Sequence, residues 1–144
     1  MTSHWLQRYW RTCLMPTDTS ALLAILKDEA ECKDFLRRIE EADHCRISTL
    51  SVLEALIILE SRSGQDAVLD MEVFLQQAGI EIIPFDLEQL AFAKRAFRLF
   101  GKGRLPAALN TGDCVSYALA QSDDEPLLFK GNDFNRTDVQ CANP

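Results

Sequence analysis

The sequence predicts an α/β fold: a single domain with a central parallel sheet flanked by helices as an α/β/α sandwich. Two observations support this prediction. Short apolar segments alternate with amphipathic helical patterns along the chain, as in a parallel sheet with crossover helices. The 144 residues contain no repeat and no low-complexity linker, so the length favours one domain. Ligands of such sheets bind at the carboxyl ends of the strands, where we expect the functional site.

Four short apolar segments are predicted to form the strands, because each is bounded by turn or cap residues. They are residues 13–15, 46–48, 80–83 and 127–129. Pro16 is expected to spoil the end of the first strand, since proline cannot donate a hydrogen bond to a ladder. Pro84 halts the third strand for the same reason.

The segments between the strands have the apolar spacing of helices. The predicted helices are residues 21–26, 31–41, 50–61, 66–79, 87–100 and 110–121. Polar residues 18–20 cap the first helix, and Gly79 closes the fourth as a C-cap. In the second helix Phe35, Leu36 and Ile39 are expected to face inward.

Residues 1–12 are predicted to be an N-terminal extension and residues 13–144 the domain. Apolar residues recur in the extension as adjacent pairs every four residues, which is a helical stripe. They are Trp5, Leu6, Tyr9, Trp10, Cys13 and Leu14. The stripe suits a membrane-surface or partner helix. We favour the alternative that Met15 is the true start and that the extension is a start-site or cloning artefact.

Composition excludes several classes of protein. The net charge of −7 excludes a generic nucleic-acid binder that works by overall charge, although not an enzyme that brings metal ions to a nucleic acid. The longest uncharged apolar stretches run about five residues, far short of the roughly 20 that span a bilayer. The five cysteines are dispersed, which fits a reducing compartment, and no secretory signal is readable. We therefore expect a cytoplasmic protein without membrane association.

Four carboxylates are the candidate functional residues. Asp18 follows the first predicted strand, Asp113 opens the last predicted helix, and Asp133 follows the last predicted strand. Glu54 lies in the apolar run 52–59, where a lone charge must be paired or bind something. Carboxylates gathered at one edge raise one another's pKa and are tolerated when cations neutralise them. Mg²⁺ or Mn²⁺ is the natural occupant of such an all-oxygen site.

Each carboxylate also has a purely structural alternative. Asp18 suits the N-cap of a helix, and Glu54 forms a formal capping box with Ser51. Asp113 suits the positive end of a helix dipole, and Asp133 suits a turn. For each carboxylate considered alone, we favour the structural interpretation. Considered together, the four carboxylates predict one functional site.

Around these residues the sequence resembles the PIN-domain ribonucleases and, within them, the VapC toxins of bacterial toxin–antitoxin pairs. The matching stretches are residues 18–25, 47–55, 101–114 and 126–134. They occur in the order and spacing of the family, and the resemblance covers about residues 13–140. Leu105 stands where relatives often carry His, Thr111 stands where an aromatic is common, and Pro16 interrupts the usual apolar end of the first strand. None of these departures removes a carboxylate.

The resemblance implies a metal-dependent endoribonuclease that cleaves phosphodiester bonds of single-stranded or loop RNA and acts as a toxin. In this interpretation Asp18 and Asp113 are the core ligands of Mg²⁺ or Mn²⁺. Glu54 and Asp133 complete the catalytic site, directly or through water.

The net charge would repel RNA, so basic residues are expected to contact the phosphates. The candidates are Lys94, Arg95, Arg98, Lys102, Arg104, Lys130 and Arg136. Phe92, Phe97 and Phe100 are interleaved with the first of these, as on an RNA-contacting face, but we favour a core role for them. Thr19 and Asn110 are predicted to position metal ligands or substrate, with helix capping as the alternative.

The resemblance also implies partners. A cognate antitoxin would insert an Arg or another basic group among the carboxylates, with the helices at 31–41 and 50–61 supplying its groove. A homodimer is expected as well. Two other functions remain open. One is a structure-specific DNA nuclease of PIN-like fold that uses the same acidic cluster, and the other is a catalytically silent interaction module.

Overall fold

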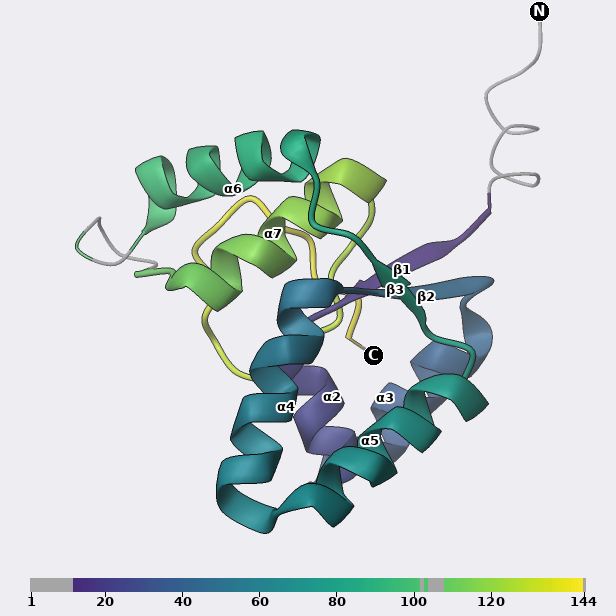
Figure 1. Ribbon diagram of the computed structural model, residues 1–144. Coiled ribbons are helices and arrows are strands. Elements are labelled where there is room, and N and C mark those ends of the chain that lie inside the picture. Colours follow the sequence, from purple (N-terminus) through teal and green to yellow (C-terminus); the bar gives the residue numbers. More distant parts are fainter. Residues whose placement is uncertain (1–11, 102, 104–107, 144) are drawn as a thin grey trace, which may run out of the picture.

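The structure, a computed structural model, describes residues 12–101, 103 and 108–143. Within this part of the chain three parallel strands pair in the order β1-β2-β3, and helices flank them (Figure 1). The predicted α/β class and parallel sheet are confirmed. Apart from Thr12, the predicted N-terminal extension lies outside the described residues, as do Lys102, Arg104 and Leu105.

The strands and helices lie close to their predicted ranges. The strands are β1 (Leu14–Thr17), β2 (His44–Ser48) and β3 (Glu81–Ile83). The helices are α2 (Thr19–Leu26), α3 (Cys32–Glu41), α4 (Thr49–Ser63), α5 (Gln65–Gln77), α6 (Leu87–Phe100) and α7 (Thr111–Asp123). All six predicted helices are confirmed. Apolar periodicity over several turns identifies a helix even where the predicted ends differ by a few residues.

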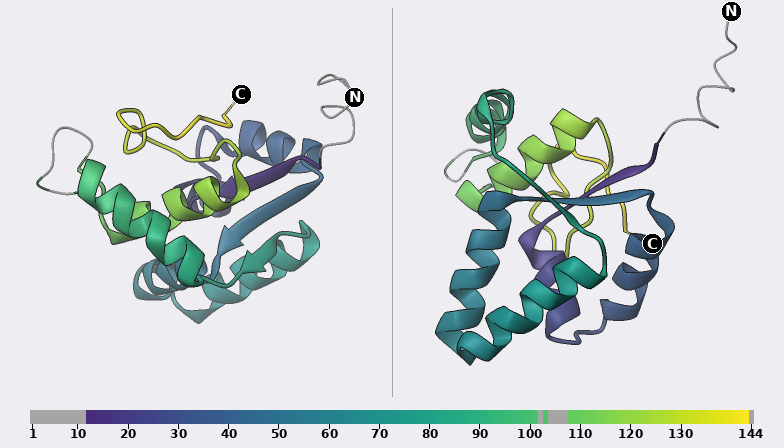
Figure 2. Two further views of the ribbon diagram at one scale, coloured as in Figure 1. Left: turned by 90° about the horizontal axis from the view of Figure 1, so that it is seen from above. Right: turned by 45° about the vertical axis from the view of Figure 1, so that its right-hand side comes forward.

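The helices divide between the two sides of the sheet (Figures 1 and 2). Helices α2 to α5 cover one side and enclose a core that includes Leu22, Ile47 and Met71. Helices α6 and α7 lie on the other side with the C-terminal segment, around a second core that includes Tyr117 and Phe134. This arrangement brings the carboxyl ends of β1 and β2 next to the first turn of α7.

Pro16 does not end the first strand, which corrects the prediction. It pairs with Arg46 within the parallel register of β1 and β2. The N–H and C=O of one strand residue point to the same side, and the carbonyl of Pro16 accepts from the Leu128 amide at 2.9 Å, on the side away from β2. The amide that proline lacks is therefore not needed in the ladder with β2, so the strand tolerates it.

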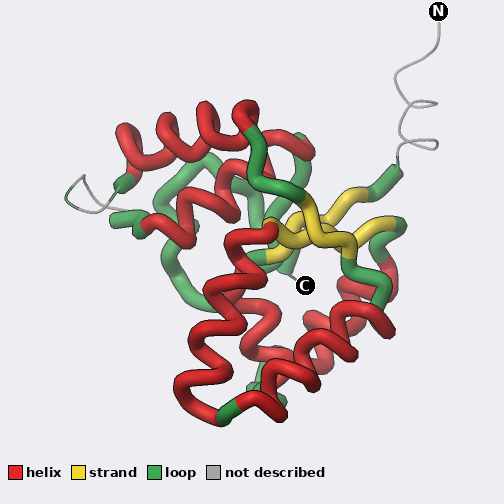
Figure 3. Tube along the Cα trace, in the orientation of Figure 1, coloured by secondary structure: helices red, strands yellow, loops and turns green. Residues whose placement is uncertain are grey.

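The predicted fourth strand at 127–129 is also wrong. Leu128 makes a single parallel bridge to Thr17, and Leu127 makes another to Cys141. Figure 3 shows this part of the chain as loop. The segment is fully buried and still adjoins the sheet, because Asp18 donates its amide to the Leu128 carbonyl at 2.9 Å.

Helix α3 buries Phe35 and Ile39 as predicted, but Leu36 is 38% exposed, so its predicted inward position is wrong. None of the described helices is long and apolar enough to cross a membrane. All five cysteines are free thiols.

Candidate active site

The four predicted carboxylates come from four separate elements. Asp18 caps α2 directly after β1, Glu54 lies on α4, Asp113 lies in the first turn of α7, and Asp133 lies in the loop after residue 129. The charges of Asp18, Glu54 and Asp133 each raise the pKa of Asp113. The fold therefore brings all four within electrostatic reach of one another, as the sequence predicted.

Asp113 has a strongly perturbed carboxyl group. Burial first, and then the neighbouring carboxylates, raise its pKa to about 7, although its hydrogen bond to the Asn110 backbone opposes the rise. That bond belongs to a reciprocal capping box: Asp113 Oδ2 accepts from the Asn110 amide at 3.0 Å, and Asn110 Oδ1 accepts from the Asp113 amide at 2.9 Å. The capping alternative thus holds for both residues, and it places the carboxylate in the cluster.

Asp18 is held by two hydrogen bonds. Its Oδ2 accepts from the Ser20 amide at 3.0 Å, as an N-cap residue should, and its Oδ1 accepts from the Ser116 hydroxyl at 2.5 Å. Burial raises the pKa of Asp18 in spite of both bonds, and Asp133 adds to the rise. Ser116 itself is fully buried and lies 3.4 Å from the Ser51 hydroxyl. The sequence contained a signal for Ser116, which follows Asp113 by three residues on the same helix face.

Glu54 does not form the predicted capping box with Ser51. Helix α4 starts earlier, and its N-cap is Ser48, whose hydroxyl accepts from the Leu50 amide at 3.3 Å. Ser51 is buried inside the helix instead. Burial raises the pKa of the half-buried Glu54, a hydrogen bond from Thr19 opposes this, and Asp18 adds to it.

Gly112 is a site residue that sequence reasoning missed. A Cβ atom on Gly112 would lie 2.1 Å from Glu54 Oε2, so any side chain here would displace the carboxylate. The signal was a glycine within the first turn of a helix, which costs stability and needs a reason such as close approach. The glycine lets Glu54 lie against the backbone at the start of α7.

Thr19 is not a helix cap, because Asp18 takes that position. Its hydroxyl donates to the Ser51 carbonyl at 3.1 Å and also bonds Glu54. Thr19 therefore ties the start of α2 to α4 and holds Glu54, which supports its predicted positioning role.

The loop that carries Asp133 is anchored to the α2–α3 turn. Lys130 forms ion pairs with Glu29 and, at 3.2 Å, with Glu31, and its amide donates to the Ser20 hydroxyl at 2.9 Å. Asp133 itself is exposed. Because the Lys130 ammonium already has two carboxylate partners, its described role is structural, and its predicted RNA contact stays a prediction.

The other predicted cations that the structure describes are exposed. Lys94, Arg95 and Arg98 lie on α6, and Arg136 lies in the C-terminal loop. None of these four forms an ion pair with a residue that the structure describes. They are therefore available to an anionic ligand.

The three phenylalanines of α6 do not share one role. Phe92 and Phe100 pack against the second core, and the ring of Phe100 lies 6.0 Å from that of Tyr117. Phe97 is 49% exposed, so the prediction that it fills the core is wrong. Helix periodicity alone did not show where the covered face of α6 ends.

The donor set fits a hard divalent ion in its chemistry. Asp18, Glu54 and Asp113 are oxygen donors whose pKa values are raised, and no described cation neutralises any of the four carboxylates. Among the described residues, however, no three Asp, Glu, His or Cys side chains converge closely enough to hold an ion. One carboxylate oxygen each of Asp18 and Asp113 accepts from a backbone amide at a helix start.

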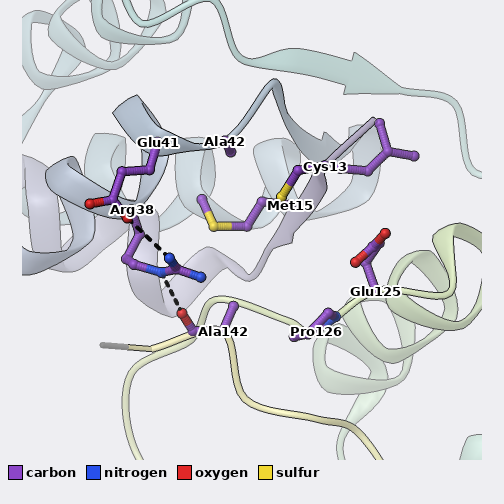
Figure 4. A pocket seen from close by; sticks show the side chains of 9 residues that line it. Cys13, Met15, Arg38, Glu41, Ala42, Glu125, Pro126 and Ala142 are labelled. Carbon is purple, nitrogen blue, oxygen red and sulfur yellow. Dashed lines mark hydrogen bonds and ion pairs between the residues drawn. The ribbon is translucent and has the colours of Figure 1, made fainter. Parts of the chain in front are cut away.

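Two hollows lie away from the carboxylates. One, of about 280 Å³, lies beside α4, α5 and β3 and is mainly apolar; it is lined by Val52, Leu56, Met71, Glu72, Leu75, Gln76, Ile80 and Ile82. The predicted groove helix 50–61 contributes Val52 and Leu56 to this lining, and helix 31–41 contributes no residue to it. The other, of about 130 Å³, lies beside Cys13, where Arg38 donates to the Ala142 carbonyl at 2.8 Å (Figure 4). Cys13 precedes β1 and Asp18 follows it, so this hollow lies at the amino end of β1 and the carboxylates lie at its carboxyl end.

Comparison with known proteins gives one consistent result. The PIN domain family model matches residues 16–140. A VapC ribonuclease of Mycobacterium bovis is 43% identical over 126 residues, covering 87% of this chain and 95% of the relative. A ribonuclease VapC of Mycolicibacterium smegmatis is 42% identical over 128 residues, covering 89% and 99%.

Solved structures share the fold at low identity. Mycobacterium tuberculosis VapC20, described as a sarcin-ricin loop cleaving toxin, aligns with a TM-score of 0.72 at 15% identity, covering 91% of this chain and 99% of that one. VapBC2 of Rickettsia felis, bound to a DNA fragment from its promoter, aligns with a TM-score of 0.69 at 17% identity, covering 89% and 96%. These likenesses confirm the fold.

Proposed function

The chain belongs to the PIN-domain family and, within it, to the VapC ribonucleases, and from this premise we propose that it is a toxin endoribonuclease that cleaves phosphodiester bonds of single-stranded or loop RNA with Mg²⁺ or Mn²⁺. One observation carries the metal-dependent chemistry. Burial first, and then the charges of Asp18, Glu54 and Asp133, raise the pKa of Asp113 to about 7, and no described cation neutralises the four carboxylates. Such a cluster is costly to the fold unless a cation from outside binds it.

In this proposal Asp18 and Asp113 would hold the ion, and Glu54 and Asp133 would complete the site. Bound there, a divalent ion supplies charge neutralisation for the phosphate and lowers the pKa of a water molecule. The chain's own part is positioning. The Thr19 hydroxyl holds Glu54, and the amide of Asn110 holds Asp113, whose carboxylate oxygens would be ligands of the ion.

Three further features support the assignment. Gly112 lets the Glu54 carboxylate lie against the start of α7, because it lacks the Cβ that would collide with Oε2. The paired Lys130 holds the loop of Asp133 near Asp18 and Asp113 without placing its own charge among them. Exposed Lys94, Arg95 and Arg98 on α6 offer positive charge for the RNA backbone on a chain whose net charge is −7.

A cognate antitoxin is the proposed partner, which the toxin–antitoxin complexes among the solved neighbours support. A basic group of that partner would occupy the same carboxylates as the metal and so block the site. The apolar hollow beside α4 and α5 suits its hydrophobic residues. A homodimer, a cytoplasmic location and one domain over residues 13–144 stay predictions.

The test is cleavage by the purified protein of a single-stranded RNA and a DNA of the same sequence, with Mg²⁺, Mn²⁺ or a chelator. We expect RNA cleavage that needs the divalent ion and that Asp18→Asn abolishes. Cleavage of DNA alone would favour the DNA nuclease. Cleavage of neither, with RNA or a basic protein still bound, would favour the silent interaction module.

A further inference from the structure

We propose that Phe97 is a stacking platform for an unpaired base of the RNA substrate, with Lys94 and Arg98 as neighbouring phosphate contacts. The inference rests on the proposed ribonuclease function and adds to it a side chain that contacts a base. Single-strand binding commonly combines aromatic rings, on which bases stack, with a positive surface that follows the backbone.

The ring of Phe97 lies outside the core that takes up its neighbours. Ala93 and Ala96 of α6 are buried, and Phe92 and Phe100 pack against the second core. Phe97 is 49% exposed. It lies on the same face of α6 as Leu90 and Lys94, because these positions are spaced by four and three residues. An aromatic ring left half in water gives up burial energy, as do Leu87 and Leu90 of the same helix, which are 83% and 52% exposed.

Gly101 fixes where the ring lies. A Cβ on Gly101 would lie 2.4 Å from Phe97 Cδ2 and 2.8 Å from Cε2, so the ring packs directly on the glycine backbone. Any other residue at 101 would push the ring away. One part of the ring is thereby held by the chain, and the exposed part remains open to a ligand.

The charge around the ring fits a nucleic acid. Lys94 precedes Phe97 by one helical turn and Arg98 follows it directly; both are exposed, and neither pairs with a described acidic residue. On a chain of net charge −7 this is a local positive surface. It complements phosphates and repels the basic segment expected of an antitoxin, so RNA is the favoured occupant.

The end of α6 adjoins the segment that leads into α7. The Leu109 amide donates to the Phe100 carbonyl at 2.7 Å, and Leu109 bridges Gly101. Asn110 follows at once and caps Asp113, so the last turn of α6 adjoins the first turn of α7, as the left side of Figure 1 shows. Phe97 therefore lies in the last turns of the helix whose end leads, through Leu109 and Asn110, to Asp113.

The test measures binding of a single-stranded RNA that carries 2-aminopurine, whose fluorescence falls when the base stacks. An Asp113→Asn background prevents cleavage. We expect Phe97→Ala to weaken binding about five- to hundredfold and to abolish the quenching, and Phe97→Trp to restore both. Phe97→Leu keeps the apolar bulk without the ring and should behave like Phe97→Ala. Leu90→Ala is the matched control, because Leu90 is 52% exposed on the same face of α6, and should bind like the parent.

A second measurement separates this inference from the proposed function. With Asp113 intact, Phe97→Ala should raise KM and leave kcat near the wild-type value, since stacking acts equally before and during cleavage. Unchanged RNA binding in Phe97→Ala, or an equal loss in Leu90→Ala, overturns the stacking role while wild-type cleavage upholds the ribonuclease. If Phe97→Ala loses inhibition by the antitoxin but binds RNA normally, the ring contacts the protein partner instead, and the stacking role is overturned. A wild type that neither binds nor cleaves RNA overturns both.

Discussion

The two ends of α7 carry a buried aspartate each, and they differ in what neutralises it. The side chain of Asp123 is only 5% exposed, and its Oδ2 forms an ion pair with Arg46 Nε at 3.0 Å. Arg46 also pairs with Glu81 at 3.3 Å. Burial raises the pKa of Asp123 and Arg46 opposes the rise. Asp113, 8% exposed, has three carboxylates for neighbours, and its pKa is raised to about 7.

The helix dipole acts against the difference between the pKa values of these two aspartates. It favours a negative charge at the start of a helix and disfavours one at the end. By that rule Asp113 should ionise more easily than Asp123, yet burial and the other carboxylates outweigh the dipole. The fold supplies a cation where the aspartate is structural. Where it supplies none, the charge is left for a ligand.

Exchanging each aspartate for asparagine tests the comparison most strongly. Asp113→Asn removes a proposed metal ligand, and we expect RNA cleavage to fall by at least about 10²-fold and Mn²⁺ binding to be severely weakened in calorimetry. The metal-free melting temperature should stay the same or rise, because a repelled charge is lost.

Asp123→Asn is the matched variant at the other end of α7. It should keep RNA cleavage and lose about 1–3 kcal/mol of stability, because Arg46 retains Glu81 as its only partner. If Asp113→Asn unfolds the protein, or if both variants lose cleavage equally, the contrast between the two ends fails.

The second prediction concerns Glu54, where the catalytic and structural interpretations differed most. Glu54→Gln keeps the shape of the side chain and can still accept the Thr19 bond, but it has no charge for a metal and cannot take a proton from water. We expect an intact fold and cleavage reduced by about 10²-fold. Cells should survive induction of this variant but not of the wild type. Wild-type cleavage by folded Glu54→Gln protein would leave the site with the three aspartates alone.

The third prediction is a pH dependence of the metal-free protein. The pKa of Asp113 is 3.8 in the unfolded chain and about 7 in the folded one, so between these values the folded state binds more protons. Stability should therefore fall as the pH rises from about 4 to about 7, by at most about 4 kcal/mol from this group. Burial raises the pKa values of Asp18 and Glu54 in the same direction.

Denaturant unfolding at several pH values, with a chelator present, measures this dependence. Asp113→Asn should reduce the dependence of the unfolding free energy on pH, and Asp123→Asn should leave that dependence unchanged. Saturating Mg²⁺ should restore stability above pH 7. A wild-type curve that rises with pH across the window would contradict an un-neutralised cluster.

The sequence was sufficient for the frame and for the four carboxylates, and its errors have identifiable physical causes. Apolar periodicity located every helix, because each buries one face over several turns. The Ser51–Glu54 pattern matched a capping box, but Ser48 offers a second start three residues earlier, and only the burial of Ser51 against Ser116 decides between them. Local sequence does not contain that contact.

The errors at Pro16 and Phe97 have the same origin. Proline is harmful only where its missing amide faces the paired strand, and the sequence does not show which side of β1 that is. Phe97 has the same local pattern as Phe100, yet α7 covers one and not the other. Both outcomes depend on the packing of distant segments.

The smallest expected effect concerns Ser116, the hydroxyl that binds Asp18 on the face of α7 one turn after Asp113. Ser116→Ala removes one donor from a buried carboxylate, which should destabilise the metal-free protein by about 1–2 kcal/mol. It also frees the Asp18 side chain to leave its present position, so we expect Mn²⁺ affinity to fall about tenfold, the scale of losing an outer hydrogen bond to a metal ligand. Ser116→Cys, nearly isosteric with a weak donor, should recover part of both losses. A structural serine without influence on the site would lower stability in Ser116→Ala and leave Mn²⁺ affinity unchanged. That result would remove Ser116 from the site and confine the special chemistry of α7 to its first turn.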